Sequence, residues 1–500
     1  MLKRIILVLG LLGILILAGC APKPVILDMQ KLSVKAHRDL LNDIALNEPI
    51  IEEISLYEAM ARALKYNLDA QIEIKDEEFR RRQNLVINSG MWPSLLATFG
   101  INSRDNLAAS SSRSVITGTQ SLEPSTSSER TYATADLTAS WDLLDFGVAY
   151  AESQQGVTEE SIARERRRKV VNRIIENVRT AYWRAVSAER TFSKLLALES
   201  LAQQALVQTR ALEEGRKTPI KFALEYQRDL LKIQRNVQQL QRELVLAKHQ
   251  LATLINLAPN TKFSLEIPSR TDIVPVLPGS ARQMIRYALY YRPELREVFY
   301  EQQIEGYKED IALYESLPGF KLLFGANYNS NDFLSNRQWA SLSTSVSWNL
   351  MSLFRYPLQR DALKAESEVI LARRQAITMA IITQVYVARA RFVRLSQELS
   401  TIRKSHNIQV KILALTEAGH KANQISQREL VMEKMNEILD EISYDTAYAD
   451  LQNAYAGLYS SMGIANFDVE IGDEEDLEEL TTKLRDRWTQ HGLALPKLGG

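Results

Sequence analysis

Two kinds of hydrophobic periodicity alternate along this chain. From Leu56 to about Ser89, apolar residues recur at helical spacing. This pattern stops at Trp92 and Pro93, because proline lacks an amide hydrogen and clashes with the preceding turn. Beyond it the period changes to two, and four segments of about ten residues are apolar on one face and polar on the other, as in strands. These segments are residues 94–102, 134–143, 320–328 and 341–350.

Each pair of predicted strands is followed by a long segment without proline. The two segments are residues 148–214 and 358–466. A helix of about 70 residues is about 100 Å long. A glycine in a polar stretch interrupts this pattern at Gly215 and again at Gly419, and glycine permits the left-handed turn that ends a helix. We therefore predict two antiparallel helical hairpins, with returning helices over residues 219–258 and 422–462.

This order of elements occurs twice. Residues 60–95 align without a gap on residues 285–320, and a second match follows the strands. The pairs that support the alignment are Ala63 with Ala288, Leu64 with Leu289, Tyr66 with Tyr291, Pro93 with Pro318 and, downstream, Trp141 with Trp348. A spacing of about 200 residues is too long for a solenoid unit. The chain is therefore expected to be a duplicated half-protein, each copy containing a helix, two strands and a helical hairpin.

The two faces of the predicted strands differ in chemistry. Their polar faces consist mainly of small side chains, whereas Trp and Tyr fall on the apolar faces. This distribution favours a transmembrane barrel with apolar residues outside and polar residues inside. A half-buried sheet in a soluble domain uses the same alternation and is the alternative. In the barrel interpretation the lumen residues are Thr134, Asp136, Thr138, Ser140, Ser343, Ser345 and Ser347.

The first twenty residues contain a separate signal. Two basic residues precede an apolar run from Ile5 to Leu17, and the run ends in LAGC with Cys20, the only cysteine of the chain. This pattern resembles a bacterial lipoprotein signal, whose cleavage leaves a lipidated Cys20 anchored by about 0.8 kcal/mol per buried methylene. An uncleaved helical anchor is the alternative, but the run is short for a span of about 20 residues. No later stretch approaches such a length, so we expect strands to cross the membrane.

Composition argues against several functions. The 61 basic and 61 acidic residues give a net charge of zero, which does not indicate nucleic-acid binding. The five histidines have no metal-ligand spacing, and no HExxH motif, phosphate-binding glycine loop or nucleophile elbow is present. We therefore expect no enzyme activity, no cofactor and no metal. A single cysteine also permits no intrachain disulfide, so packing alone must stabilise the fold.

Together, these features resemble the TolC family of outer-membrane efflux channels over about residues 55–465. The resemblance rests on the lipoprotein-like signal, the duplicated halves, the glycine-containing hairpins, and the corner residues Pro93, Pro318, Trp141 and Trp348. It implies an α+β, mostly α, fold that forms a homotrimer. Four strands from each chain would build a 12-stranded transmembrane β-barrel, continued by a long periplasmic α-helical coiled-coil barrel.

The number of strands supports a trimer independently. Four strands cannot close a barrel, and open edges are not tolerated in lipid. Two chains would supply eight strands, whose interior is filled by side chains, whereas three chains supply twelve and leave a lumen. A conduit therefore needs the trimer.

The resemblance also implies a function and partners. The protein would be the outer-membrane channel of a tripartite system, conducting drugs, metals or other small molecules passively to the exterior. It would dock on a periplasmic membrane-fusion adaptor coupled to an inner-membrane pump of the resistance-nodulation-division or ABC type. Alternatives are a type I secretion duct for polypeptides and a lipoprotein coiled-coil scaffold that transports nothing. The docking residues implied are Gly215, Arg216, Lys217, Thr218, Gly419, His420, Lys421 and Ala422.

One departure from the family concerns the periplasmic constriction, expected at Ile425, Arg428 and Glu429. Some family members carry aspartates at the positions of Ile425 and Arg428. Here Glu429 or Asp440 would supply negative charge, or three copies of Arg428 would form a basic ring that favours anions. The alternative is that Arg428 pairs with a carboxylate on a neighbouring helix.

Six segments are expected along the chain, and we place the mature protein in the outer membrane. The segments are a lipoprotein signal peptide (1–19), a lipidated leader with little regular structure (20–54), the first repeat (55–260), a linker outside the main bundle (261–280), the second repeat (281–465) and a solvated, partly acidic tail (466–500).

Overall fold

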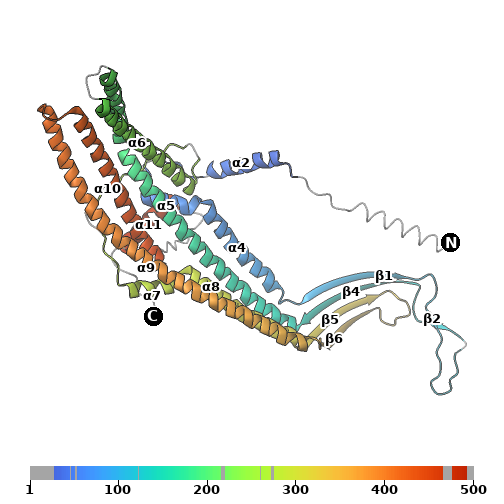
Figure 1. Cartoon of the computed structure of the whole chain (residues 1–500). Coiled ribbons are helices and arrows are strands. Elements are labelled where there is room, and N and C mark those ends of the chain that lie inside the picture. The colour runs from blue at the N-terminus through green and yellow to red at the C-terminus, as the bar shows by residue number, and fades with distance from the viewer. Residues whose placement is uncertain are drawn as a thin grey trace.

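The computed structural model describes residues 27–45, 47–50, 53–121, 123–214, 220–258, 261–271, 275–464 and 476–491. The chain is mostly helical, with a small antiparallel sheet at one end of a long helical body (Figure 1). This confirms the predicted fold class for a single chain. Cys20 and the first tip, Gly215 to Thr218, lie outside the described residues.

The elements follow the predicted order in both copies. In chain order they are α2 Met29–Ala45, α3 Leu56–Tyr66, α4 Leu68–Ser89, β1 Ser94–Ser103, β2 Ala109–Ser110, β3 Ser125–Thr126, β4 Thr131–Asp142, α5 Leu143–Glu214, α6 Ile220–Leu254, α7 Ala281–Tyr291, α8 Pro293–Ser316, β5 Gly319–Asn329, β6 Gln338–Ser347, α9 Ser352–Lys421, α10 Gln427–Ser461 and α11 Leu477–His491.

The predicted helix from Leu56 to Ser89 is in fact two helices. Asn67 ends α3 and caps α4, because its side-chain oxygen accepts hydrogen bonds from the amides of Asp69 and Ala70. The second copy breaks at the matched place, where Arg292 separates α7 from α8 and proline occupies the first position of α8. Helical periodicity continues across both breaks, so it did not reveal them.

Two long helices, α5 with 72 residues and α9 with 70, form the body. Helices α8 and α10 both pack between them, and Figure 1 shows these two helices lying end to end. One apolar core joins α5 and α10 to α3 and α11, and a second joins the C-terminal part of α5 to α6 and α10. A third core joins α7 and the start of α8 to α9 and the end of α10. The helical periodicity therefore produces a layered helical body around three cores.

The duplication is visible where the returning helices end. Asn256 after α6 and Gly463 after α10 both adopt the left-handed conformation, with φ of 53° and 70°. The end of α6 lies beside the corner between α3 and α4, where Asn67 donates to the Leu254 carbonyl, and the end of α10 lies beside the corner between α7 and α8. The first copy uses asparagine, whose Nδ2 donates to Asp43 at 2.9 Å. The second uses glycine, because a Cβ at this position would lie within 3.0 Å of the backbone of Tyr291.

Three expectations for the segments outside the repeats were wrong. The leader contains the helix α2, whose Asp43 accepts the hydrogen bond from Asn256. The linker packs on the body, because Leu265 is buried in the main core and Ile54 pairs with it. The tail forms α11, which buries Leu480 and Leu484 against α3. In the linker and the tail, apolar residues pack against a tertiary partner that local composition does not reveal. Helix α2 has no buried residue, and Asp43 connects it to the body.

Within the described ranges, one helix is long and apolar enough by length and composition to cross a membrane. It is α9, and a single helix of this kind is weak evidence. This helix packs along α8 and α10. The finding therefore does not change the prediction that strands form the membrane span.

Candidate channel wall and hairpin tip

The four long strands form one antiparallel sheet in the order β1-β4-β5-β6. Its register aligns polar positions across strands: Asp136 pairs with Thr98 on one side and Asn327 on the other. Ser140 and Ser343 both pair with Leu323 of β5. All seven residues predicted to line the lumen therefore lie on one face of this sheet, because side chains alternate along each strand.

Sequence patterns missed part of this polar face. Asn327 lies at its centre, where its amide nitrogen donates to Asp136 Oδ1 at 3.0 Å and its amide oxygen accepts from Ser341 Oγ at 2.9 Å. Trp339 pairs with Asn327 in the ladder, so it shares the polar face although tryptophan was expected on the other one. Leu96 also falls on this face. Trp339 precedes the segment in which alternation was recognised, and the register between β5 and β6 identifies its face.

The opposite face of the sheet is apolar and uncovered. Phe99 is 72% exposed and Val346 is 69% exposed, and other apolar residues of this face are similarly accessible. The strands at the two sides, β1 and β6, each have a strand neighbour on one side only. The sheet therefore has an exposed apolar face, a polar face and two open edges, and an open edge can pair with another strand.

The second hairpin tip is tight, but its glycine is used differently from the prediction. Helix α9 continues through Gly419 to Lys421, and the left-handed residue is Asn423, with φ of 57°. A side chain at Gly419 would meet the Ile425 side chain at 2.6 Å. Glycine therefore allows the close approach of the Ile425 side chain, which a larger residue would displace, and it does not form the turn itself. The ring of His420 hydrogen-bonds the Ile425 carbonyl at 2.9 Å through Nδ1.

Arg428, predicted near the constriction, contacts the first hairpin. Its guanidinium lies 4.3 Å from the ring centroid of Phe222 and 3.7 Å from Asp229 Oδ2, both on α6. This contact favours the interpretation in which Arg428 pairs with a neighbouring helix. Glu429 is exposed, and Asp440 accepts a hydrogen bond from Ser405. The placement of these residues at a constriction stays a prediction.

No protein-family model matches this sequence, and a search of curated proteins gives no match. Several solved structures resemble it. The outer-membrane channel CmeC of Campylobacter jejuni has a TM-score of 0.64 at 12% identity, covering 86% of this chain and 89% of that chain. The open-state outer-membrane channel MtrE of Neisseria gonorrhoeae has a TM-score of 0.62 at 18% identity, covering 82% and 89%. CusC, whose structures concern transmembrane channel formation, has a TM-score of 0.63 at 15% identity, covering 84% and 96%.

This chain has the TolC-family fold. The resemblance found in the sequence is thereby confirmed at the level of fold. The similarity covers more than four fifths of this chain in each comparison, so it includes both repeats of the TolC-like body.

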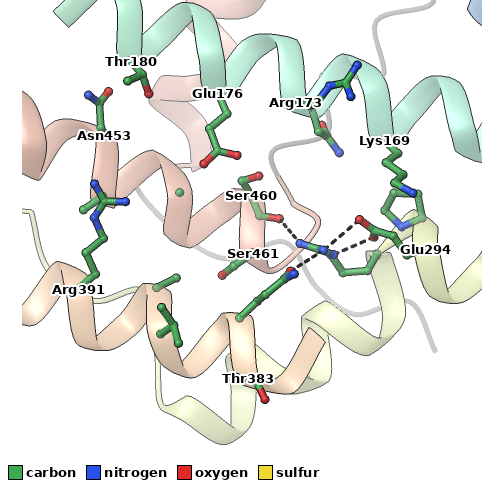
Figure 2. Close-up of a pocket in the computed structure, with 18 of the residues that line it drawn as sticks. Lys169, Arg173, Glu176, Thr180, Glu294, Thr383, Arg391, Asn453, Ser460 and Ser461 are labelled. Atoms are coloured by element: carbon green, nitrogen blue, oxygen red, sulfur yellow. Dashed lines mark hydrogen bonds and ion pairs between the residues drawn. The ribbon is translucent and has the colours of Figure 1, made fainter. Parts of the chain in front are cut away.

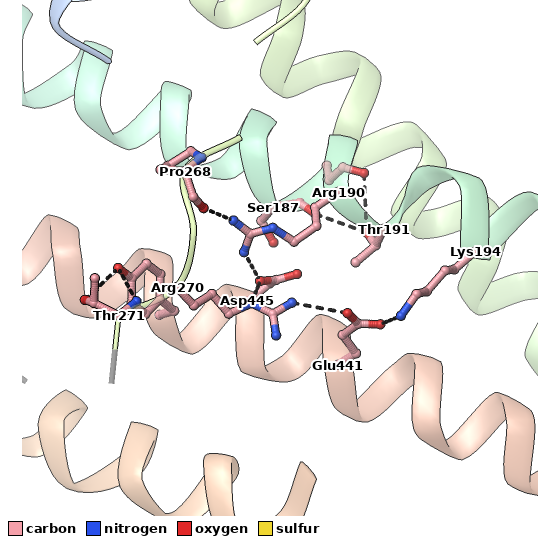
Figure 3. Close-up of polar contacts among 11 residues, drawn as sticks. Ser187, Arg190, Thr191, Lys194, Pro268, Arg270, Thr271, Glu441 and Asp445 are labelled. Carbon is pink, nitrogen blue, oxygen red and sulfur yellow. Dashed lines mark hydrogen bonds and ion pairs between the residues drawn. The ribbon is translucent and has the colours of Figure 1, made fainter. Parts of the chain in front are cut away.

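In this TolC-like chain, a cluster of charged residues ties the linker to the body. Figure 3 shows Asp445 of α10 between Arg190 of α5 and Arg270 of the linker, at 2.5 and 2.6 Å. Glu441, one turn earlier, pairs with Arg270 and with Lys194. Burial acts to raise the pKa of Glu441, but the hydrogen bonds and charges of Lys194 and Arg270 lower it overall. Its contribution to stability is therefore present above its unfolded pKa and is lost on acidification.

Replacing Asp445 with asparagine is expected to destabilise the body strongly. The carboxylate is almost fully buried and pairs with two arginines. Asp445→Asn therefore removes the counter-ion of Arg190 and leaves Arg270 with Glu441 alone. We expect a loss of about 3 kcal/mol in the free energy of unfolding, measured by urea denaturation. The exposed pair of Asp332 and Arg337 provides the control, because Asp332→Asn should cost less than about 1 kcal/mol. Equal effects at the two sites would contradict the assignment.

Sequence reasoning also missed a cavity of about 560 Å³ in the middle of the body. We call it the junction cavity. It lies between α5 and α9, where the start of α8 faces the end of α10 (Figure 2). Arg292 donates to the Ser460 carbonyl at 3.4 Å, pairs with Glu294 at 2.9 Å and donates to Gln384. A gap between two helix ends has no local signature in the sequence.

Proposed function

We propose that this protein is the outer-membrane channel component of a tripartite efflux system. It would conduct small molecules passively from the periplasm to the exterior, without enzyme activity. The observation that supports this most directly is the sheet, which has an exposed apolar face, a polar face and two open edges. Lipid can cover the apolar face, water can fill the space beside the polar face, and strands of other copies can pair with the two open edges.

The repeats support closure by neighbouring copies of this chain. Helix α8 packs between α5 and α9, whereas its counterpart α4 packs along α5. Ile304 of α8 is 9% exposed, but the residue aligned with it, Phe79 of α4, is 56% exposed. A second copy that places its α9 against α4 would give Phe79 the environment that Ile304 already has. Repeating this contact three times closes a ring.

The same operation closes the sheet. Joining β6 of one copy to β1 of the next converts three four-stranded sheets into one cylinder of twelve strands, without exposed edges. The lumen would be lined by the polar face that contains Asp136 and Asn327. Support at the level of fold comes from the solved structures, which are outer-membrane channels by their own descriptions. A lipidated Cys20 would add an anchor in the same membrane.

Labelling of adjacent positions tests the barrel. Leu137 and Thr138 lie on opposite faces of β4, so cysteines at these two positions face lipid and lumen respectively. We expect a water-soluble thiol reagent to modify Thr138→Cys at least tenfold faster than Leu137→Cys in reconstituted trimers. The proposal also requires single-channel conductance in planar bilayers. Equal labelling rates, together with no conductance, would favour the non-transporting scaffold.

The second tip is proposed to dock on a periplasmic adaptor that is coupled to an inner-membrane pump. Gly419→Val is expected to abolish efflux while the trimer still assembles, because the new side chain displaces Ile425 and changes the shape of the tip. Efflux is measured by the sensitivity of cells to toxic compounds. Gly419→Ala combined with Ile425→Ala removes the overlap and should restore part of the efflux. Loss of the trimer with normal adaptor binding would contradict this role.

A further inference from the structure

The junction cavity lies at a helix junction that the two repeats build with different side chains. In the first repeat the matched helix ends are joined directly, because Asn67 Nδ2 donates to the Leu254 carbonyl at 2.9 Å. Arg292 takes the place of Asn67 in the sequence alignment, and its longer side chain bridges the corresponding ends of α8 and α10. The cavity lies beside this bridge. The arginine bridge, which replaces the asparagine contact of the first repeat, therefore forms part of the wall of this cavity.

Basic side chains predominate around this cavity. Its charged lining residues are Lys169, Arg173, Arg184, Arg292 and Arg391 against Glu176, Glu294 and Asp450. Arg292 is paired with Glu294, and Arg173 lies 3.6 Å from Asp69. Within the part of the chain that the structure describes, Lys169, Arg184 and Arg391 have no salt-bridge partner. The opening of the cavity therefore has cationic groups available for a ligand.

A buried arginine lies behind the cavity. Arg179 of α5 is 3% exposed and lines a small hollow of about 20 Å³, which shares Asn172, Glu176 and Thr180 with the junction cavity. Its guanidinium stacks on Trp488 at 4.1 Å, and its Nε has no hydrogen-bond partner in the described structure. Burial lowers the pKa of Arg179 to about 10, so the group is still protonated at neutral pH.

No carboxylate of the described residues lies within salt-bridge distance of Arg179. A buried cation without a counter-ion is costly, and the cost falls when an anion comes close. Asn453 Oδ1, in the wall between the two hollows, also has no hydrogen-bond donor in the described structure. Unmet polar groups at the floor and unpaired cations at the opening both indicate a ligand that is negatively charged and has hydrogen-bond donors or bound water.

The cavity opens on the face of α5 opposite the core that α5 forms with α3 and α11. Lys169, Glu176 and Thr180 repeat at helical spacing on one side of α5, and Figure 2 shows Glu176 and Thr180 directed toward the cavity. Val178 and Tyr182 occupy the opposite side, in the core with α3 and α11. If α3 and α11 lay inside a ring of long helices, they would block the bore of the channel. In the proposed trimer the cavity therefore opens on the inner wall.

We propose that the junction cavity binds the anionic group of solutes that pass through the channel, such as a carboxylate, sulfonate or phosphate. This inference rests on the proposed channel function and specifies its substrate class. Three copies around the bore place a belt of cations midway along the helical body, and converging charges raise the local concentration of anions. Glu176 and Asp450 oppose this effect and keep anion binding weak enough for release.

The test measures local potential with charged thiol reagents in the full-length trimer. Thr383, exposed at the opening of the cavity, is replaced by cysteine, and the parent protein serves as a blank for Cys20. We expect the anionic sulfonatoethyl reagent to modify this cysteine about fivefold faster than the cationic trimethylammonioethyl reagent does, after each rate is divided by that reagent's rate with free cysteine. Arg184→Gln with Arg391→Gln should lower this ratio about threefold, and Glu176→Gln should raise it about twofold. Arg394→Gln, an exposed α9 residue that does not line the cavity, should leave it unchanged.

Competition by an inorganic anion distinguishes binding in the cavity from a general effect of the electrostatic potential. Sulfate should slow the anionic reagent at the introduced cysteine more than chloride does at equal ionic strength, and Arg179→Gln should remove this protection while melting temperature and trimer content are monitored. A ratio unaffected by the arginine substitutions, or equal effects of sulfate and chloride, would overturn the inference. Conductance separates the two proposals: a conducting trimer without anion preference refutes only the cavity, whereas an anion-selective cavity in a non-conducting protein refutes the channel.

Discussion

Gly463→Val is expected to cost at least about 3 kcal/mol in the stability of the helical body. Gly463 has φ of 70°, which is unfavourable for a β-branched residue. A side chain at this position would also meet backbone atoms of Tyr291 and Arg292 at 2.8 to 3.0 Å. Backbone cannot rotate away as a side chain can, so α7, α8 and α10 must separate.

Thermal and urea denaturation of the detergent-solubilised protein measure this effect. Gly306→Ala is the matched control, because a side chain there meets no atom within 4 Å and Gly306 lies inside α8. Alanine is the better helix former by about 1 kcal/mol, so the control should stabilise slightly. If Gly463→Val were as stable as the parent protein, the packing of α10 against the α7–α8 corner would be incorrect.

Phe79→Asp is expected to prevent assembly while the chain still folds. In the proposed trimer, Phe79 is covered by α9 of the next copy, and a carboxylate would be buried there without a partner. We expect a loss of about 3 kcal/mol at each of the interfaces, which is sufficient to leave mainly monomer at micromolar concentration. Light scattering after size-exclusion chromatography measures the mass, and circular dichroism checks that the helical content is unchanged.

Val115→Asp is the control for this experiment. Val115 is fully exposed between β2 and β3, away from the helical interface, so the trimer should persist. A trimeric Phe79→Asp protein would contradict the contact between α4 and the neighbouring α9. It would leave the sheet-edge pairing of β6 with β1 as the remaining support for closure.

The polar face of the sheet could be predicted where it depends on the alternation of polar and apolar residues along a strand. The residues expected on the polar face share it, because a strand determines the face of each side chain by its parity. Asn327 has the polar parity of its segment but was not singled out, and Trp339 precedes the segment in which alternation was recognised. That these two residues pair with each other, and that Asn327 also pairs with Asp136, is visible only in the register. At the tip, Gly419 was recognised, but its role depends on Ile425 packing against it.

By itself, the sequence determined the four strands, the two long helices, their returning partners and the duplication that relates them, because period, proline and glycine act over a few residues. Only the tertiary structure decided where Asn67 and Arg292 break the helices, how α2, the linker and α11 pack, and where the junction cavity lies. These features arise from contacts between segments that are distant along the chain. Local patterns contain no information about which of several compatible neighbours a side chain will meet.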